Sequence, residues 1–145
     1  MLRGSHRATV DSKGRLKIPV AFLETLREYG TQFYVTSENG DHAWIYPMKV
    51  WSEIEERLAK LPSHNRAKQK FLTRTNYFGQ VVTIDRQGRV LVPPALREAA
   101  EMKGEVDVMG KLNYLEVWNH ARFLEHLKGS PITDDDWKVL GDLGI

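Results

Sequence analysis

The segment DSKGRLKIP, residues 11–19, occurs a second time as DRQGRVLVP, residues 85–93. Both copies keep Asp, Gly, Arg and Pro at the same spacing, with apolar residues at the same two positions between Arg and Pro. Identities of these residue types at fixed spacing rarely arise by chance, and internal repeats take precedence over local patterns. The chain therefore contains a duplication whose copies are offset by 74 positions.

Each copy predicts a β-hairpin, then a helix, then two more strands. Period-two alternation flanks the D-x-x-G-R turn, which is typical of two strands joined by a short loop. A helical pattern begins at the proline of each copy, and a glycine is expected to end it. The positions expected to face inward are Phe22, Leu23 and Leu26 before Gly30, and Leu96, Ala99 and Ala100 before Gly104. The two later strands are expected at residues 32–37 and 42–47, and at residues 105–110 and 113–118.

Further helices are predicted between and after the copies. Two helical patterns cover residues 49–61 and 64–75, and Pro62 separates them. Asn119 is a suitable N-cap for a helix over residues 120–129, and Thr133 is suited to cap a short last helix. The side chains expected to face inward are Val50, Trp51, Ile54, Leu58, Leu61, Ala67, Phe71, Leu72, Phe123, Leu124 and Leu127.

These patterns predict an α+β, β-rich fold made of two tandem β-β-α-β-β repeats. The two halves are expected to share one core, because a domain of half this length would bury too little surface to be stable alone. We expect the first repeat at residues 5–49, a helical linker at 50–76, the second repeat at 78–121, and a C-terminal helix with an acidic tail at 122–145.

The D-x-x-G-R turn explains two of its three fixed residues. The glycine falls where a three-residue hairpin loop needs positive φ, and the aspartate can accept hydrogen bonds from loop N–H groups. The arginine has two explanations that are equally supported: an ion pair that locks the turn, or a side chain presented to a phosphate or a guanine. These residues are Asp11, Gly14 and Arg15 in the first copy, and Asp85, Gly88 and Arg89 in the second.

The net charge of +2 conceals an uneven distribution. Residues 1–20 contain five cations and one acid, residues 62–76 contain four cations and no acid, and the segment after Ser130 is rich in aspartate. Basic clusters of this kind suit a phosphate backbone, although ordinary solvated faces explain them equally well. If nucleic acid is the partner, the first copy is expected to contribute more.

No catalytic motif is recognisable, so we expect the protein not to be an enzyme and to use no cofactor, metal ion or small molecule. The carboxylates of Glu53, Glu55 and Glu56 suit a solvated helix face, and the five histidines are scattered. There is no cysteine, which excludes disulfides and thiolate metal sites. No segment is apolar enough for a membrane span or a signal peptide, so a cytoplasmic location is expected. Aromatic residues are not concentrated near the basic hairpins, which disfavours single-stranded RNA as the partner.

The two motifs together resemble the MraZ family, bacterial regulators found at the head of the division and cell-wall gene cluster. MLRGSHRATVDSKGRLKIPVAFLE, residues 1–24, resembles the start of these proteins, and DRQGRVLVPPALRE, residues 85–98, resembles their second half. One Asp-x-x-x-Arg motif alone would indicate only the wider SpoVT–AbrB-like group of DNA-binding domains. The resemblance implies that the two copies interlock as one pseudo-two-fold swapped-hairpin barrel with the helices outside.

The resemblance also implies a function. Subunits would form a ring, an octamer or similar, that binds short G-rich direct repeats in double-stranded DNA and represses its own operon at the nucleoid. The aromatic residues Trp44, Tyr46 and Trp51 could serve the ring interface, but filling the core is the favoured role. The alternative is an antitoxin-like or scaffold module with the same fold. The acidic tail matches no motif of the family. The positions carried over as DNA contacts are Arg15 and Arg89, with Arg3, Arg7, Lys13, Lys17 and Arg86 beside them.

Overall fold

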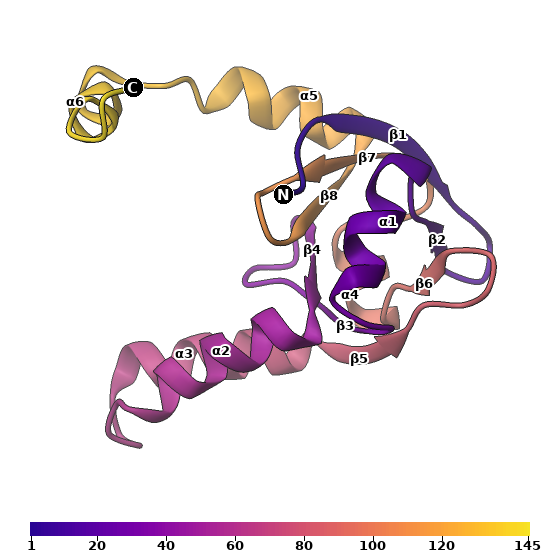
Figure 1. Cartoon of the computed structure of the whole chain (residues 1–145), viewed down its shortest axis with the longest axis horizontal. Helices are drawn as coiled ribbons and strands as arrows, with labels where there is room; N and C mark the ends of the chain where they lie inside the picture. Colours follow the sequence, from indigo (N-terminus) through magenta and orange to yellow (C-terminus); the bar gives the residue numbers. More distant parts are fainter.

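Eight antiparallel strands form one sheet that curls into a nearly closed barrel (Figure 1). The computed structural model describes the whole chain, residues 1–145. The strand order across the sheet is β5-β3-β4-β8-β7-β1-β2-β6. The strands are β1 (Ser5–Val10), β2 (Arg15–Lys17), β3 (Gln32–Thr36), β4 (Ala43–Pro47), β5 (Gln80–Thr83), β6 (Arg89–Leu91), β7 (Gly104–Gly110) and β8 (Leu115–Asn119).

The strand order has two-fold pseudosymmetry. The edge strands β5 and β6 come into contact, which brings the two ends of the sheet together. Exchanging β1–β4 with β5–β8 then leaves the closed order unchanged. Four of the seven strand pairings cross between the copies, because β1 pairs with β7, β2 with β6, β3 with β5 and β4 with β8. The predicted α+β fold, with two β-β-α-β-β repeats interlocked in one barrel, is confirmed.

The simple hairpin expected in each copy forms only in part. Strand β2 meets β1 at a single pair, Val10 with Leu16, whereas all three of its residues pair with β6. Strands β5 and β6 share no ladder, although the N–H of Asp85 donates to the carbonyl of Arg89 across the turn at 3.0 Å. The strand that follows each turn therefore finds its main partner in the other copy.

All six predicted helices are present. Asn119 caps its helix as expected, since its side chain accepts a hydrogen bond from the N–H of Arg122. Thr133 forms a capping box with Asp136. The chain contains no helix with the length and apolar character that a bilayer span requires. The helices are α1 (Val20–Glu28), α2 (Met48–Ala59), α3 (Arg66–Tyr77), α4 (Pro94–Ala99), α5 (His120–Gly129) and α6 (Asp134–Gly141).

The expected boundaries of the two short helices need correction. Pro19 and Pro93 are the N-caps of α1 and α4 rather than their first residues. Helix α4 stops at Ala99, which is exposed, and does not continue to Gly104. Its last turn is closed by a hydrogen bond from the N–H of Met102 to the carbonyl of Arg97 at 2.9 Å, with Glu101 in the left-handed conformation at φ 51°. The buried side chain of Met102 draws the chain into the core at this point.

Five side chains expected to face inward are exposed instead. These are Leu61, Ala67, Ala99, Leu124 and Leu127. Helix α2 ends at Ala59, so Leu61 lies beyond it. Helix α3 buries Thr75 alone, whose carbonyl accepts hydrogen bonds from the hydroxyls of Tyr34 and Thr36 at 3.1 and 2.6 Å. Helix α5 buries none of its residues fully. These helices touch the barrel with only part of their length, which helical periodicity does not reveal.

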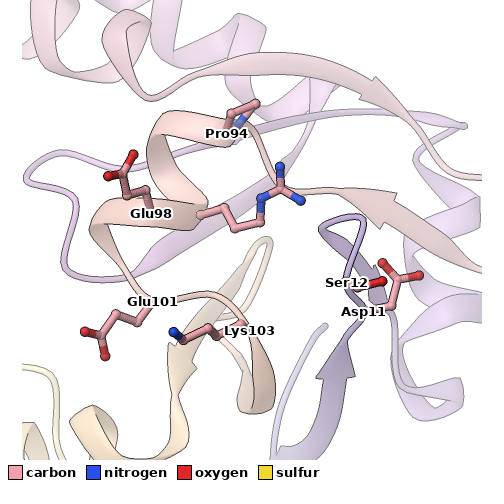
Figure 2. Close-up of a pocket in the computed structure, with 7 residues that line it drawn as sticks. Asp11, Ser12, Pro94, Glu98, Glu101 and Lys103 are labelled. Atoms are coloured by element: carbon pink, nitrogen blue, oxygen red, sulfur yellow. The ribbon is translucent and has the colours of Figure 1, made fainter.

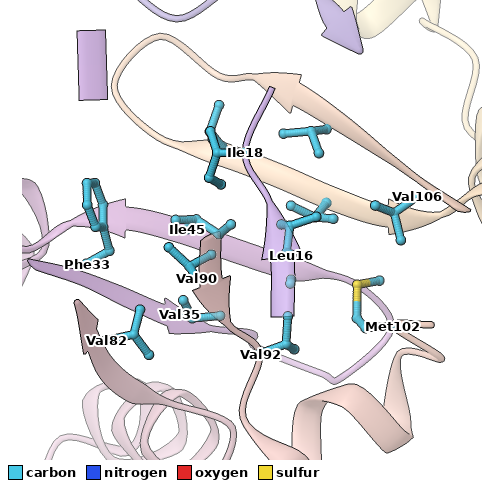
Figure 3. Close-up of a cluster of buried hydrophobic side chains, with 14 of the residues drawn as sticks. Leu16, Ile18, Phe33, Val35, Ile45, Val82, Val90, Val92, Met102 and Val106 are labelled. Carbon is cyan, nitrogen blue, oxygen red and sulfur yellow. The ribbon is translucent and has the colours of Figure 1, made fainter. Parts of the chain in front are cut away.

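One hydrophobic core contains residues from both copies (Figure 3). Leu16 and Val90, from β2 and β6, face each other across the copies inside it. A second cluster lies on the outer face of β3 and β4, where Tyr34 stacks on Trp51 and α2 and α3 cover the strands. These two strands are therefore buried on both faces, which explains their continuous apolar runs. Trp51 and Tyr46 are buried as expected, and Trp44 is partly exposed.

Truncating Leu16 should test whether the crossing of the copies stabilises the barrel. Leu16 is 0% exposed, so Leu16→Ala should lower the free energy of unfolding by about 2–5 kcal/mol through lost burial and the cavity left behind. Leu91, on the opposite face of the paired strand, is 38% exposed, and Leu91→Ala should cost about 0.5–1 kcal/mol. Urea unfolding measures both, and equal losses would contradict this account of the core.

Candidate nucleic-acid interface

Strands β2 and β6 form a two-stranded ribbon where the two copies meet. Their register pairs Arg15 with Leu91, Leu16 with Val90, and Lys17 with Arg89. Because side chains alternate along a strand, the middle pair faces the core and the outer pairs face away from it. We call the outward positions Arg15, Lys17, Arg89 and Leu91 the ribbon face.

The two D-x-x-G-R turns lie at opposite ends of this ribbon, because the strands are antiparallel. Each turn is held by the strand of the other copy. The N–H of Val92 donates to the carbonyl of Gly14, and the N–H of Ile18 donates to that of Gly88, both at 2.9 Å. The two glycines have φ of 80° and 75°, as the loop geometry predicted. A Cβ at either position would also crowd a side chain of the other copy, since on Gly88 it would approach the Leu23 side chain to 3.1 Å.

The aspartate locks the turn in the same way in both copies. In the first, Oδ1 of Asp11 accepts from the N–H groups of Lys13 and Arg15, both at 2.9 Å, and Oδ2 accepts from Nε of Arg15 at 2.8 Å. In the second, Asp85 accepts equivalent hydrogen bonds from Gln87 and Arg89, all at 2.9 Å. The first of the two explanations for the arginine, an ion pair with the aspartate, is therefore confirmed.

The lock uses only one edge of each guanidinium. Nε of Arg15 and of Arg89 binds the aspartate, while their terminal Nη groups have no hydrogen-bond partner in the protein. Both side chains are partly exposed on the ribbon face. A guanidinium held by Nε has a fixed plane and presents its remaining N–H donors in a defined direction. The structural role thus leaves the second role, contact with a ligand, available to the same side chain.

Hydrogen bonding keeps the two aspartates ionised. The backbone N–H of Arg15, together with its side chain and the N–H of Lys13, lowers the pKa of Asp11 against an opposing effect of partial burial. The backbone N–H of Arg89 is likewise the largest cause of the lowered pKa of Asp85. Each carboxylate is neutralised by its own arginine, so the remaining charge on the ribbon and its turns is positive. These remaining cations are Lys13 and Arg86 on the turns and Lys17 on the ribbon face, all exposed.

Two of the predicted contacts are not brought to the ribbon face. Arg3 follows the buried Leu2 at the far end of β1, where its backbone lies against Gly110. Arg7 lies nearer and lines a shallow groove of about 290 Å³ with Lys17. Its guanidinium is occupied, however: Nη2 is 2.8 Å from Nε2 of His120, and Nη1 and Nε lie 3.6 and 3.8 Å from carboxylate oxygens of Glu105 and Asp107.

Arg97 is a cation beside the first turn that the sequence patterns did not single out. Its guanidinium lies against Gly14, where a Cβ would overlap it, and it forms no ion pair. It borders a polar groove of about 670 Å³ formed by the first turn, α4 and the segment after it. Figure 2 shows the carboxylates of Glu98 and Glu101 directed away from Asp11 and Ser12. The offset of 74 positions between the copies aligns Arg97 with Leu23. That difference in residue type could have indicated Arg97 from the sequence.

The remaining polar clusters do not resemble a catalytic or metal centre. His42 lies between the carboxylates of Asp41 and Glu116, and its ring stacks on Trp118 at 4.4 Å. His120 binds Asp107 at 2.6 Å. No group of three or more side chains is arranged to hold a metal ion. The N–H donors that the two turn locks leave free lie on the ribbon face.

The turn locks should make stability sensitive to acid. Because folding lowers the pKa of Asp11 and Asp85, their stabilising effect is complete above the ordinary Asp pKa of about 4 and is lost as the pH falls through the lower folded value. The double variant Asp11→Asn/Asp85→Asn should be less stable at neutral pH and lose less stability between about pH 5 and pH 2. Urea unfolding at several pH values measures this. Asp142→Asn, outside the turns, is the control, and an unchanged acid dependence in the double variant would contradict the assignment.

Comparisons with known proteins agree with this geometry. The family model described as "MraZ protein, putative antitoxin-like" matches residues 1–74 and 79–132. The chain is 47% identical over 146 residues to a protein of Acidobacterium capsulatum and 50% identical over 147 residues to one of Koribacter versatilis, with 100% of each chain covered. It is 36% identical over 143 residues to a protein of Moorella thermoacetica, covering 98% of this chain and 95% of the relative. All three relatives carry the name "Transcriptional regulator MraZ".

The family model covers both copies of the duplicated turn, and the relatives match from one end of the chain to the other. The interlocked barrel and the two Asp–Arg turns are what the resemblance implied. The chain therefore belongs to the MraZ family.

Proposed function

We propose that this protein is a transcriptional regulator that binds double-stranded DNA through the ribbon face and its two turns. The observation that carries the proposal is the pair of locked arginines, whose terminal N–H groups point outward without a partner. The names of the relatives support a role in transcription. No catalytic centre competes with this explanation.

The shape and charge of the ribbon suit the major groove of DNA. The groove admits a two-stranded β-ribbon, and an arginine fork can pair with O6 and N7 of guanine. In this proposal Arg15 and Arg89 read bases, while Lys13, Lys17 and Arg86 contact phosphates and set the register. Lys17 and Arg89 lie directly opposite each other, which costs stability when no anion is present. Binding a polyanion would remove that repulsion.

The first copy is proposed to dominate DNA binding. It contributes Lys13 and Lys17 besides its locked arginine, and Arg97 adds a third cation beside its turn. At the counterpart positions on and beside the second turn lie Gln87, Leu91 and Leu23. The second turn therefore supplies only Arg86 in addition to its own locked arginine.

Self-association and target choice extend the proposal, as the family resemblance implies. Several copies would form a ring, because head-to-tail contacts between identical subunits can close on themselves. A ring presents the same ribbon at regular intervals, which suits directly repeated sites and multiplies weak contacts. The regulator would repress the division and cell-wall gene cluster from its own promoter, and act in the cytoplasm at the nucleoid. Arg3 and Arg7 remain possible phosphate contacts in such an assembly, outside the ribbon face.

The alternative is an antitoxin-like or scaffold module that uses the same fold to bind another protein. That function predicts one stoichiometric protein partner in a pulldown and no preference for promoter DNA. The charge of the ribbon favours DNA, since its only two carboxylates are neutralised by their own arginines.

Removing the first locked arginine should abolish most specific binding. Arg15→Ala should weaken binding to DNA from upstream of the protein's own gene by about 1–3 kcal/mol for each subunit contact, because a base-reading fork is lost. Arg89→Ala should have a smaller effect. Fluorescence anisotropy at several salt concentrations, with scrambled DNA alongside, measures this.

Arg57→Ala, in the last turn of α2 and far from the ribbon, is the matched control and should bind as the wild type does. Unfolding of Arg15→Ala would mean that the arginine serves only the lock. Equal, weak and salt-sensitive binding of both DNAs would mean that the cations provide counterion release without sequence recognition.

Arg97 and Leu23 occupy equivalent positions beside the two turns, and exchanging their residue types should move a phosphate contact from the first turn to the second. Arg97→Leu gives the first turn the residue that borders the second, and should reduce both affinity and the salt dependence of binding by about one phosphate contact per subunit. Leu23→Arg should increase both for the second turn. The slope of log affinity against log salt is the readout, and an unchanged slope in Arg97→Leu would exclude Arg97 from the interface.

A further inference from the structure

Helix α6 is formed but packs against nothing in its own chain. None of its side chains is buried, and no hydrogen bond or ion pair joins residues 131–145 to the rest of the protein. Figure 1 shows it beyond the end of α5, away from the barrel. Its start is nonetheless strongly stabilised, because Thr133 and Asp136 form a capping box and three aspartates lie in its first turn. An isolated helix of this length is marginal without packing, which indicates that it packs elsewhere.

The segment from α5 to the end of the chain exposes large apolar side chains beside its aspartates. Trp137 is 50% exposed and Val139 is 67% exposed. Large apolar side chains left exposed along one segment are typical of a site of protein contact. The exposed apolar residues of this segment are Leu124, Leu127, Ile132, Trp137, Val139, Leu143 and Ile145, and its aspartates are Asp134, Asp135, Asp136 and Asp142.

The outer face of α3 is complementary to α6 in charge. Ala67, Lys70, Arg74 and Tyr77 follow one another at helical spacing, and all four are exposed. No acid occurs between residues 62 and 76, and no cation of α3 forms an ion pair. The neighbouring helix α2 carries Glu53, Glu55 and Glu56 instead, so a chain rich in aspartate is attracted to α3 and not to α2.

The basic face of α3 that matches α6 is out of reach within one chain, so a second copy of the chain would supply it. Figure 1 shows α6 and the α2–α3 pair on separate sides of the molecule, so α6 does not reach α3 of its own chain. Helix α6 follows α5 as α3 follows α2, yet α3 folds back against β3 through Thr75 and α6 does not fold back. The first copy is thus followed by a basic helix, α3, that packs on the barrel with its inner face. The second copy is followed by an acidic helix, α6, that does not pack on the barrel.

We propose that α6 of one copy docks across the outer face of α3 of a neighbouring copy. The aspartates of α6 face Lys70 and Arg74, and Trp137 packs on the aliphatic stems and charged heads of these two side chains. The contact joins two different surfaces and is therefore head-to-tail. The inference rests on the self-association in the proposed function and names the segment that produces it.

Site-specific crosslinking tests this contact directly, because the chain has no cysteine of its own. One full-length protein carries Gly141→Cys on α6, one turn after Trp137 on the same face, and a second, ¹⁵N-labelled, carries Thr73→Cys on α3. After mixing and mild oxidation, mass spectrometry should find a disulfide between a labelled and an unlabelled chain. Glu24→Cys, on the exposed side of α1, replaces the α3 variant as the matched control and should give no crosslink with α6.

Charge exchange tests the same contact without a covalent bond. Asp134→Lys/Asp135→Lys should weaken self-association by about tenfold or more, and Lys70→Glu/Arg74→Glu should do the same, because each places like charges together. Combining both pairs should restore association. Sedimentation velocity measures assembly, and circular dichroism checks that each variant is folded.

The outcomes separate this inference from the proposed function. Crosslinking of α6 to α3 with rescue by charge exchange supports the docking. Assembly that persists without the crosslink overturns the docking and leaves the proposed ring intact. A wild-type protein that stays monomeric overturns both the ring and the docking, while anisotropy still shows whether that monomer binds DNA.

Discussion

Two reciprocal backbone hydrogen bonds hold the ribbon on which the rest of the structure depends. Each runs from the strand end of one copy, at Ile18 or Val92, to the glycine carbonyl in the turn of the other copy. Neither turn is therefore fixed by its own half of the chain alone. The same crossing puts Leu16 and Val90 face to face in the core, so folding the barrel and presenting the ribbon face are one event.

The locked arginine connects this framework to chemistry. A free arginine side chain would lose much conformational freedom on binding a base, and that cost would reduce affinity. Here the aspartate has already fixed Nε, with three hydrogen bonds that also shape the turn. The donors that remain are held on a rigid strand pair and not on a flexible loop. A chain with a net charge of only +2 can thus present a concentrated positive surface, since its acids are placed elsewhere or already neutralised.

Duplication gave the protein two equivalent frameworks, and substitutions have since made them unequal. The interlocked strands keep the two-fold order, because a change there would disturb both halves. The residues and helices around the two turns and outside the sheet differ more between the copies. Arg97 stands where the other copy has Leu23, and the helix after α2 covers the sheet while the helix after α5 extends from it. Asymmetry is therefore found at the surface, where it can set binding strength and assembly without affecting the core.

The sequence alone determined the features that depend on neighbours a few positions away. The duplication, the β-β-α-β-β order, the positive φ of Gly14 and Gly88, and the caps at Asn119 and Thr133 are local, and all were predictable. Of the candidate site, the locked arginines and the turn cations followed from the same motif.

Only the tertiary structure decided which strands pair, which helix faces are covered and which cations are free. The sequence suggests Arg7 as a DNA contact, but its guanidinium is held by acids of β7 and by His120. No motif in the sequence singles out Arg97, yet its guanidinium lies against the first turn. Leu124 and Leu127 have helical spacing yet face solvent. These outcomes depend on contacts between residues that are distant in the chain, and neither periodicity nor motif spacing carries information about such contacts.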